Sequence, residues 1–350
     1  MTTRRRRPGT LRDAKVTLAH GGGGKAMLDL IDAVFVAAFD NPAMGDLEDQ
    51  ARVSHPALAN GARLAFTTDS YVVDPLFFPG GDIGRIAVCG TVNDLAVGGA
   101  EPLWLSCAMI IEEGTEVETL RRVAASMRAA ADEANVVIVT GDTKVIGRGG
   151  ADKLFVTTSG VGVIPPGRDL AARRIAPGDV ALVNGPLGDH GAAIMAARGD
   201  MALSTALESD CRPLHELMTA LLIAAPGARC ARDATRGGLA AVLNEFAAAA
   251  GVGIEIDERA VPLRDEVRGV CEILGLDPLY LANEGTLVAF VPEDEAGAAL
   301  AAMRATAAGA DACAIGRAVD DHAGTVTMAT VFGGSRIVDM LVGEQLPRIC

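Results

Sequence analysis

Short apolar runs and amphipathic stretches alternate along this chain, which predicts an ordered mixture of strands and helices. An apolar run at residues 15–19 leads into a glycine loop, and apolar positions then recur at helical spacing over residues 27–38. Residues 118–135 have the pattern of an amphipathic helix. Residues 153–164 have the apolar, β-branched pattern of a strand and end at a double proline.

The pattern begins again after Pro165 and Pro166, which we take as the domain boundary. Strand, glycine loop and helix are again predicted in order over residues 179–198. We therefore expect an α/β (α+β) protein of two domains, and no GxGxxG follows a strand as a dinucleotide fold would require. The predicted units are a disordered basic arm at residues 1–14, an N-terminal domain at 15–165, a C-terminal domain at 166–342 and a mobile tail at 343–350.

Charge and cysteine usage exclude several functional classes. The formal net charge is −14, which argues against general nucleic-acid binding because that function needs a basic surface. No secretory signal follows the arginine run at residues 4–7, and no apolar run reaches membrane-spanning length. The seven cysteines are far apart and form no CxxC, which predicts free thiols in a cytoplasmic protein.

Three acidic motifs in the first half predict a metal–nucleotide site. They are "TTDS" with Asp69, "NDLA" with Asn93 and Asp94, and "GDTK" with Asp142 and Lys144. Carboxylates among small residues suit Mg²⁺, which bridges protein carboxylates to substrate phosphates. Each aspartate alone is explained as well by a helix cap or a turn. Three in one domain, beside a glycine loop, favour the metal–nucleotide interpretation.

The glycine loop "HGGGGK" supplies backbone N–H groups that can face an anion, and Lys25 adds a charge. It is not a P-loop, because Ala26 stands where that motif needs Ser or Thr. A flexible turn explains the same residues. The expected phosphate contacts are Gly21, Gly22, Gly23, Gly24 and Lys25.

The second half contributes three further candidates. Arg236 precedes two glycines and could hold a phosphate, although a surface ion pair explains it equally well. His190, within "GDHG", is either a proton carrier or a satisfied loop histidine, and we favour the latter. Glu284, within "NEG", is a candidate base whose alternative is a turn carboxylate.

Several stretches together resemble the HypE family of hydrogenase maturation proteins: "AHGGGGKAM", "FTTDSYVVDPLFFPGGDIG", "GTVNDLA", "TGDTKV", "LGDHGA", "RDATRGG", "LANEGTL" and the terminal "LPRIC". That family belongs to the PurM-like ATP-binding superfamily, and the resemblance covers about residues 15–350. Its most specific element is the terminal Cys350, combined with the three acidic motifs. Gly22 stands where the family often carries a serine, so no hydroxyl role is expected there.

The resemblance implies an ATP-dependent carbamoyl dehydratase. In the family, the C-terminal thiol receives a carbamoyl group from the carbamoyltransferase HypF. The thiocarboxamide is then dehydrated with ATP to a thiocyanate, whose cyano group passes to iron on the HypC–HypD scaffold for the [NiFe]-hydrogenase. The implied fold is PurM-like, with an ATP-binding N-terminal domain, and the implied assembly is a homodimer whose subunits both contribute strands to the nucleotide cleft.

The resemblance also assigns roles to individual positions. Cys350 would carry the substrate, Glu284 would take the amide proton, with His190 as its substitute, and Lys144 would stabilise the developing charge. The residues expected to bind Mg²⁺–ATP are Asp69, Asp94 and Asp142, with Asn93 and Arg236 as further nucleotide contacts.

Two other readings stay open at this point. Another ATP-dependent synthetase or kinase of the superfamily would share the aspartate motifs without needing a terminal thiol. A non-enzymatic ATP-binding protein would use the tail only as a docking peptide. The apolar run "YVVDPLFFP" would suit a dimer interface or, equally, a buried core strand.

Overall fold

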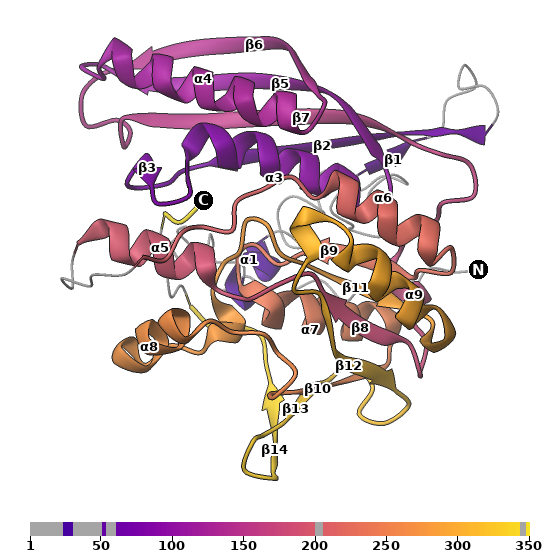
Figure 1. Ribbon diagram of the computed structural model, residues 1–350. Helices are drawn as coiled ribbons and strands as arrows, with labels where there is room; N and C mark the ends of the chain where they lie inside the picture. Colours follow the sequence, from indigo (N-terminus) through magenta and orange to yellow (C-terminus); the bar gives the residue numbers. More distant parts are fainter. Residues whose placement is uncertain (1–23, 31–50, 54–60, 200–205, 344–347) are drawn as a thin grey trace.

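Two α/β halves, each built on one large sheet, make up the described part of the chain (Figure 1). The computed structural model describes residues 24–30, 51–53, 61–199, 206–343 and 348–350. The predicted basic arm and the loop residues Gly21, Gly22 and Gly23 therefore lie outside the described residues. Among the described residues, no helix is both long and apolar enough to span a membrane.

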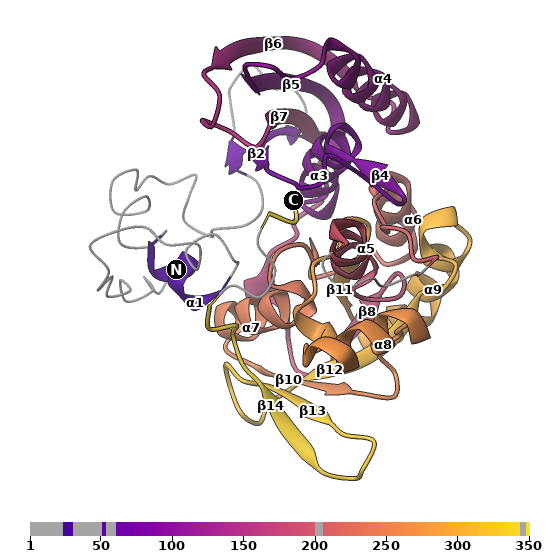
Figure 2. The ribbon, with the colours of Figure 1, turned by 90° about the vertical axis from the view of Figure 1, so that its left-hand side faces the viewer.

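The N-terminal half contains a five-stranded sheet in the order β1-β2-β7-β5-β6. Neighbouring strands are antiparallel except for the parallel pair β5 and β6, which α4 connects. The bounds are β1 Ala51–Val53, β2 Arg63–Tyr71, β5 Glu101–Glu112, β6 Val137–Ile146, β7 Leu154–Ile164, and α4 Val117–Glu133, with the short pair β3 Phe77–Phe78 and β4 Gly81–Asp82 at the side. Figure 2 shows α3 and α4 on the same side of this sheet.

Helix α3 (Ile83–Val97) is the central element, lying between this sheet and the C-terminal half. Its N-cap Asp82 accepts hydrogen bonds from the backbone N–H groups of Gly84 and Arg85, at 2.7 and 3.1 Å. All residues of the helix are buried except Arg85 and Asp94. A helix that is apolar almost all round must be covered on all sides. Asp94 is one of its two polar residues that are not fully buried, and it accepts a hydrogen bond from the Thr67 hydroxyl of β2.

The C-terminal half contains a seven-stranded sheet in the order β14-β13-β10-β12-β8-β11-β9. Helix α7 packs on one face, with Phe246 in that core, while α6 and α9 pack on the other. Both faces are covered, so all five residues of β11 are buried. The bounds are β8 Val180–Val183, β9 Cys230–Asp233, β10 Gly253–Asp257, β11 Leu287–Val291, β12 Cys313–Val319, β13 Val326–Ala329, β14 Ser335–Val338, α5 Asp189–Arg198, α6 His215–Ala224, α7 Gly238–Ala250, α8 Asp265–Leu274 and α9 Glu293–Arg304.

The two halves are joined through Asn93 of α3. Its amide nitrogen donates to the carbonyl oxygens of Arg212 and Glu284, at 3.1 and 3.3 Å, and its oxygen accepts from the Leu214 N–H at 2.8 Å. A buried amide with all these bonds fixes the orientation of α3 against the loops of the C-terminal half.

The run "YVVDPLFFP" is a core segment. Tyr71, Val73, Leu76 and Phe78 are 2%, 1%, 5% and 8% exposed and join the core cluster that α3 and α4 form. The sequence allowed either a dimer interface or a buried core strand, and these four side chains belong to the core.

Candidate functional site

The last three residues of the chain lie between the two halves, near β3, α3 and α5 (Figures 1 and 2). We call residues 348–350 the tail tip. Ile349 is only 4% exposed and joins the core cluster of the N-terminal half, and Cys350 packs against the same cluster. The tail tip is therefore inserted between the two halves, with Ile349 buried and Cys350 half-buried.

Charged groups from both halves surround the Cys350 thiol. Burial raises its pKa well above that of an ordinary thiol, Arg236 opposes this, and Glu284 adds to it by charge and by a hydrogen bond. The raised pKa favours the protonated thiol. Since the thiolate is the nucleophile, insertion of the tail tip lowers the reactivity of Cys350.

Glu284 lies in the loop before β11, and the surrounding side chains fix that loop tightly. Asp210 accepts from the N–H groups of Glu284 and Gly285, at 2.9 and 3.0 Å, and from the Thr286 hydroxyl at 2.9 Å. Burial, with the negative charges of Asp210 and Asp69, raises the pKa of Glu284 well above its usual value. A rigidly held carboxyl with a raised pKa is suited to proton transfer near neutral pH.

Asp69 and Asp94 are brought together beside Tyr71. The Thr67 hydroxyl donates to Asp94 Oδ2 at 2.7 Å, and Asp69 follows Thr67 by two residues, so both side chains face α3. Burial raises the pKa of Tyr71, and the charges of Asp69 and Asp94 raise it further. Gly90 permits this packing, because a Cβ there would lie 2.3 Å from the Tyr71 hydroxyl.

This carboxylate pair fits a Mg²⁺–nucleotide site, since Mg²⁺ is usually held by one or two carboxylates and substrate phosphates. No cluster of three or more His, Cys, Asp or Glu side chains among the described residues could hold a metal ion without such a substrate.

Arg236 lies in the turn between β9 and α7 and reaches across to the N-terminal half. Its Nη2 is 3.7 Å from Asp69 Oδ1. The glycines that follow have a packing role: a Cβ on Gly238 would lie 2.4 Å from the Leu279 carbonyl oxygen, and Gly238 has φ +62°. The positive charge of Arg236 thus lies near both the Cys350 thiol and Asp69.

His190 contacts the tail tip and is fully buried. Its Nε2 is 2.7 Å from the Ile349 carbonyl oxygen, and its Nδ1 is 2.8 Å from Ser209 Oγ. Phe78 packs edge-on against the ring, with centroids 5.5 Å apart. Burial lowers the pKa of His190, which favours the neutral imidazole.

Asp142 and Lys144 lie apart from this group within one chain. They are on the edge strand β6, where the Lys144 ammonium is 3.6 Å from Asp142 Oδ2. The register Asp142–Ala108–Thr157–Ser70 puts Asp142 on the sheet face opposite to Asp69. Three strand spacings separate β6 from β2, which is about 14 Å. A single-chain site that combines Asp69, Asp94 and Asp142 is therefore not formed by the described residues.

The remaining predicted positions are engaged elsewhere in the structure. Lys25 forms an exposed ion pair with Asp29, at 2.7 Å, and its backbone N–H donates to the Leu341 carbonyl oxygen at 3.0 Å. Gly24 packs on the same carbonyl group. Asn93 uses its amide to join the two halves, as described above. The nucleotide contacts of Gly24, Lys25 and Asn93 stay predictions.

Three residues of the site escaped sequence reasoning. Tyr71 lies near the carboxylates, Asp210 holds the Glu284 loop, and Arg198 binds the tail tip. Asp210 and Arg198 act over long sequence separations, and their local sequence carries no motif. Tyr71 stands two residues after Asp69 on a predicted strand, so strand periodicity could have placed it on the same face.

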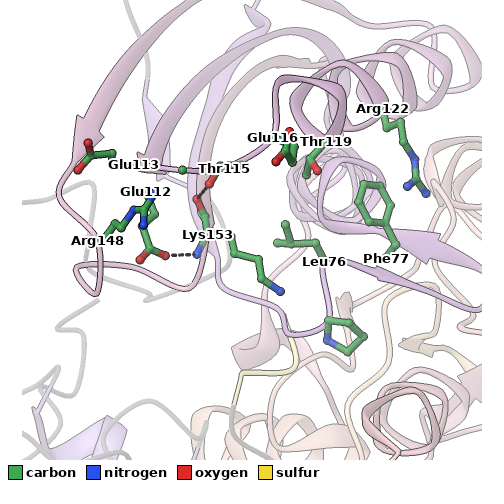
Figure 3. Close-up of a pocket in the computed structure, with 12 residues that line it drawn as sticks. Leu76, Phe77, Glu112, Glu113, Thr115, Glu116, Thr119, Arg122, Arg148 and Lys153 are labelled. Atoms are coloured by element: carbon green, nitrogen blue, oxygen red, sulfur yellow. Dashed lines mark hydrogen bonds between the residues drawn. The ribbon is translucent and has the colours of Figure 1, made fainter.

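A groove of about 700 Å³ lies on the N-terminal half. Its walls come from the segment after Asp74, from the β5–α4 connection, and from the β6–β7 loop. Figure 3 shows the Lys153 side chain extending into this groove between those walls. The Glu112 carboxylate accepts from the N–H groups of Gly149 and Lys153, at 2.6 and 3.0 Å, and thereby fixes the β6–β7 loop.

Comparison with known proteins identifies the family. Residues 48–164 match the family of AIR synthase related proteins, N-terminal domain, and residues 176–329 match the C-terminal domain. The chain is 70% identical over 341 residues to the carbamoyl dehydratase HypE of Rhodobacter capsulatus, which covers 97% of this chain and 99% of that relative. The chain belongs to the HypE family of carbamoyl dehydratases.

Solved structures of HypE proteins are also similar. A HypE–HypF complex gives a TM-score of 0.83 at 46% identity and covers 89% of this chain and 99% of that one. A HypE in complex with ATP gives a TM-score of 0.80 at 46% identity, and the match covers 96% of this chain and 100% of that one. The expected PurM-like α/β fold, the HypE resemblance and the assignment to an enzyme family are confirmed.

Proposed function

We propose that this protein uses ATP to dehydrate a carbamoyl group carried on Cys350, as a step in hydrogenase maturation. The thiol would first receive the carbamoyl group as a thiocarboxamide and then be converted to a thiocyanate. The position of Cys350 carries this proposal, because the terminal thiol lies against Glu284 and Arg236, beside the Asp69–Asp94 pair. A docking peptide would not require a base and a cation around its last atom.

The chemistry needs a better leaving group than an amide oxygen. Transfer of the γ-phosphoryl group of ATP to that oxygen makes phosphate the leaving group and releases ADP. Loss of the protons from nitrogen with loss of phosphate then gives the nitrile. The net change is thiocarboxamide and ATP to thiocyanate, ADP and phosphate, so the amide oxygen leaves in the phosphate.

Glu284 would take a proton from the amide nitrogen. Its raised pKa makes the ionised carboxylate a stronger base than an exposed glutamate, and Asp210 prevents the loop from shifting during transfer. Arg236 would stabilise negative charge on the phosphorylated oxygen, since its guanidinium lies near both Cys350 and Asp69. Asp69 and Asp94 would hold Mg²⁺, which neutralises phosphate charge in such transfers.

Lys144 can assist only if a second copy of the chain brings β6 to this site. The open sheet face gives a physical reason for such a homodimer. Phe66, Val161, Trp104 and Val137 form one cross-strand row on that face. Phe66, Trp104 and Val137 are 49%, 49% and 59% exposed in the single chain. A row of exposed apolar side chains, on the same sheet face as Asp142 and Lys144, is typical of a covered interface.

The tail must also reach partners. Loading needs the thiolate, which the inserted position disfavours, so we infer that the carbamoyltransferase HypF acts on a withdrawn tail. The HypE–HypF structure among the relatives supports this partner. The thiocyanate would be delivered on a withdrawn tail as well, to the HypC–HypD iron scaffold.

Coupling between ATP hydrolysis and the thiol tests the proposed function. With HypF, carbamoyl phosphate and ATP, ADP release above the HypF background should require Cys350 and disappear in Cys350→Ala. The control is Cys313→Ala, a partly buried thiol on β12. Hydrolysis that continues in Cys350→Ala would instead favour a synthetase or kinase acting on a free small molecule.

A further inference from the structure

We propose that Arg348 is an electrostatic latch, which pairs with Asp152 and Asp74 to hold the tail tip in its inserted position. The latch sets how often Cys350 is shielded from solvent, and its importance for catalysis rests on the proposed function. Arg348 is a positioning residue in this account, because it acts through the position of Cys350.

The Arg348 guanidinium contacts two carboxylates of the N-terminal half. Its Nη1 donates to Asp152 Oδ2 at 2.8 Å, and its Nη2 is 4.0 Å from Asp74 Oδ2. Both carboxylates lie on segments that flank the tail tip. The guanidinium therefore ties the tail tip to two separate segments of the N-terminal half.

The backbone of Arg348 has an unfavourable conformation, which hydrogen bonds to its carbonyl oxygen hold in place. Its φ is +53°, in the left-handed region that residues other than glycine seldom adopt. Its carbonyl oxygen accepts from the Asp74 N–H at 3.2 Å and from Arg198 Nη2 at 2.7 Å. Arg198 also donates to the Asp74 carbonyl oxygen at 2.9 Å. An unfavourable conformation is thus held by partners from both halves, and release of the tail would relax it.

Asp152 stands on a well-anchored loop. The neighbouring Lys153 donates its N–H to Glu112, and its carbonyl oxygen accepts from the Thr115 hydroxyl at 3.0 Å and from the Glu112 N–H at 2.8 Å (Figure 3). The loop therefore presents Asp152 at a fixed place, next to Lys153, which lines the groove. A fixed carboxylate loses little freedom when it binds the guanidinium.

The ion pair between Arg348 and Asp152 can break readily. The side chains of Arg348 and Asp152 are 47% and 41% exposed, so water and salt screen their attraction. A weak and screened pair lets the tail leave for loading and delivery, whereas a fully buried pair would retain it.

Alkylation of Cys350 measures the latch without any partner or nucleotide. The protein alone is treated with iodoacetamide at low ionic strength, and modification of the C-terminal peptide is followed by mass spectrometry. The free peptide "LPRIC" gives the rate for an unshielded thiol. Arg348→Gln and Asp152→Asn should each raise the rate, by about two- to fivefold for an exposed pair.

A double variant separates the latch from general damage to the structure. Arg348→Gln combined with Asp152→Asn should react at the rate of Arg348→Gln alone, because the first change already removes the pairing. Added salt should speed the wild-type reaction and leave the double variant unchanged. Matched controls are Arg128→Gln and Asp132→Asn, an exposed ion pair on α4, which should react as wild type.

The proposal is overturned if the single variants react like wild type, if their effects multiply in the double variant, or if wild type already reacts like the free peptide. None of these rates depends on HypF or on ATP. A failure of carbamoylation would therefore count against the proposed function, while the alkylation rates decide the latch independently.

Discussion

The Nε2 atom of His190 lies 2.7 Å from the carbonyl oxygen of Ile349. A carbonyl oxygen only accepts, so Nε2 carries the hydrogen, and Nδ1 then accepts from the Ser209 hydroxyl at 2.8 Å. Both nitrogens of this neutral, buried ring are occupied while the tail tip is inserted. The histidine therefore holds the tail, which supports the view that it is a satisfied histidine and not the proton carrier, although it lies in the first turn of α5 and not in a loop.

Two substitutions of His190 distinguish these roles. Glutamine can still place an amide N–H near the Ile349 carbonyl, whereas leucine leaves that oxygen buried without a donor. We expect His190→Gln to keep single-turnover dehydration within about tenfold of wild type and His190→Leu to lose about 5- to 100-fold. His322→Leu, at an exposed histidine, is the control. Equal and severe losses in the glutamine and leucine variants would indicate acid–base chemistry instead.

Glu284→Gln should block dehydration after normal loading. The amide keeps the shape of the side chain but cannot accept a proton, so we expect the rate of ATP-dependent water loss to fall by about 10²- to 10⁴-fold. Carbamoylation by HypF should be unaffected, because we propose that it takes place on the withdrawn tail. Rapid quench with peptide mass analysis measures both steps, and Glu272→Gln on the exposed face of α8 is the control. A dehydration rate close to that of wild type would exclude Glu284 as the base.

The same substitution should change how stability depends on pH. The folded-state pKa of Glu284 is raised, mainly by burial, so the folded protein holds a proton that the unfolded chain releases above its ordinary carboxyl pKa. This contribution is neutral at low pH and becomes destabilising as pH rises. Glu284→Gln should therefore raise Tm relative to wild type more at pH 8 than at pH 5. A difference in Tm that is equal at the two pH values would contradict the raised pKa.

Trp104→Glu should dissociate the proposed homodimer. The substitution puts a charge into the apolar row on the open sheet face, which should raise the dimer Kd by about 30-fold or more. Sedimentation velocity over a range of concentrations measures the change. Ile223→Glu is the matched control, since Ile223 on α6 is 72% exposed and lies away from that face. If Trp104→Glu sediments as wild type does, another surface must form any dimer.

The sequence predicted the fold well because its patterns are local. Each of these patterns spans only a few residues: the strand and helix periodicities, the glycine loops and the double proline. Together they indicated two α/β halves. The terminal motif likewise identified the family, since "LPRIC" occurs with the acidic motifs as one set.

The assembly of the site depends on tertiary contacts that no local pattern contains. Asp142 and Asp69 occupy similar motifs, yet strand register puts them on opposite sheet faces. Asn93 stands beside Asp94 in the chain, and the turn of α3 directs it to the other half of the protein. Asp210 holds Glu284 from 74 residues away. Such relationships follow from how the sheet and helices pack, so sequence reasoning could only nominate these residues.

The mass of the C-terminal peptide tests the central claim most directly. The protein is incubated with HypF, carbamoyl phosphate and ATP, with Cys350→Ala in parallel. The mass of the terminal peptide is followed over time by mass spectrometry. Our account predicts a carbamoyl adduct on Cys350 that loses one water as ATP is consumed. A carbamoyl adduct that stays intact while ATP is hydrolysed, or a tail that is never modified, would contradict it.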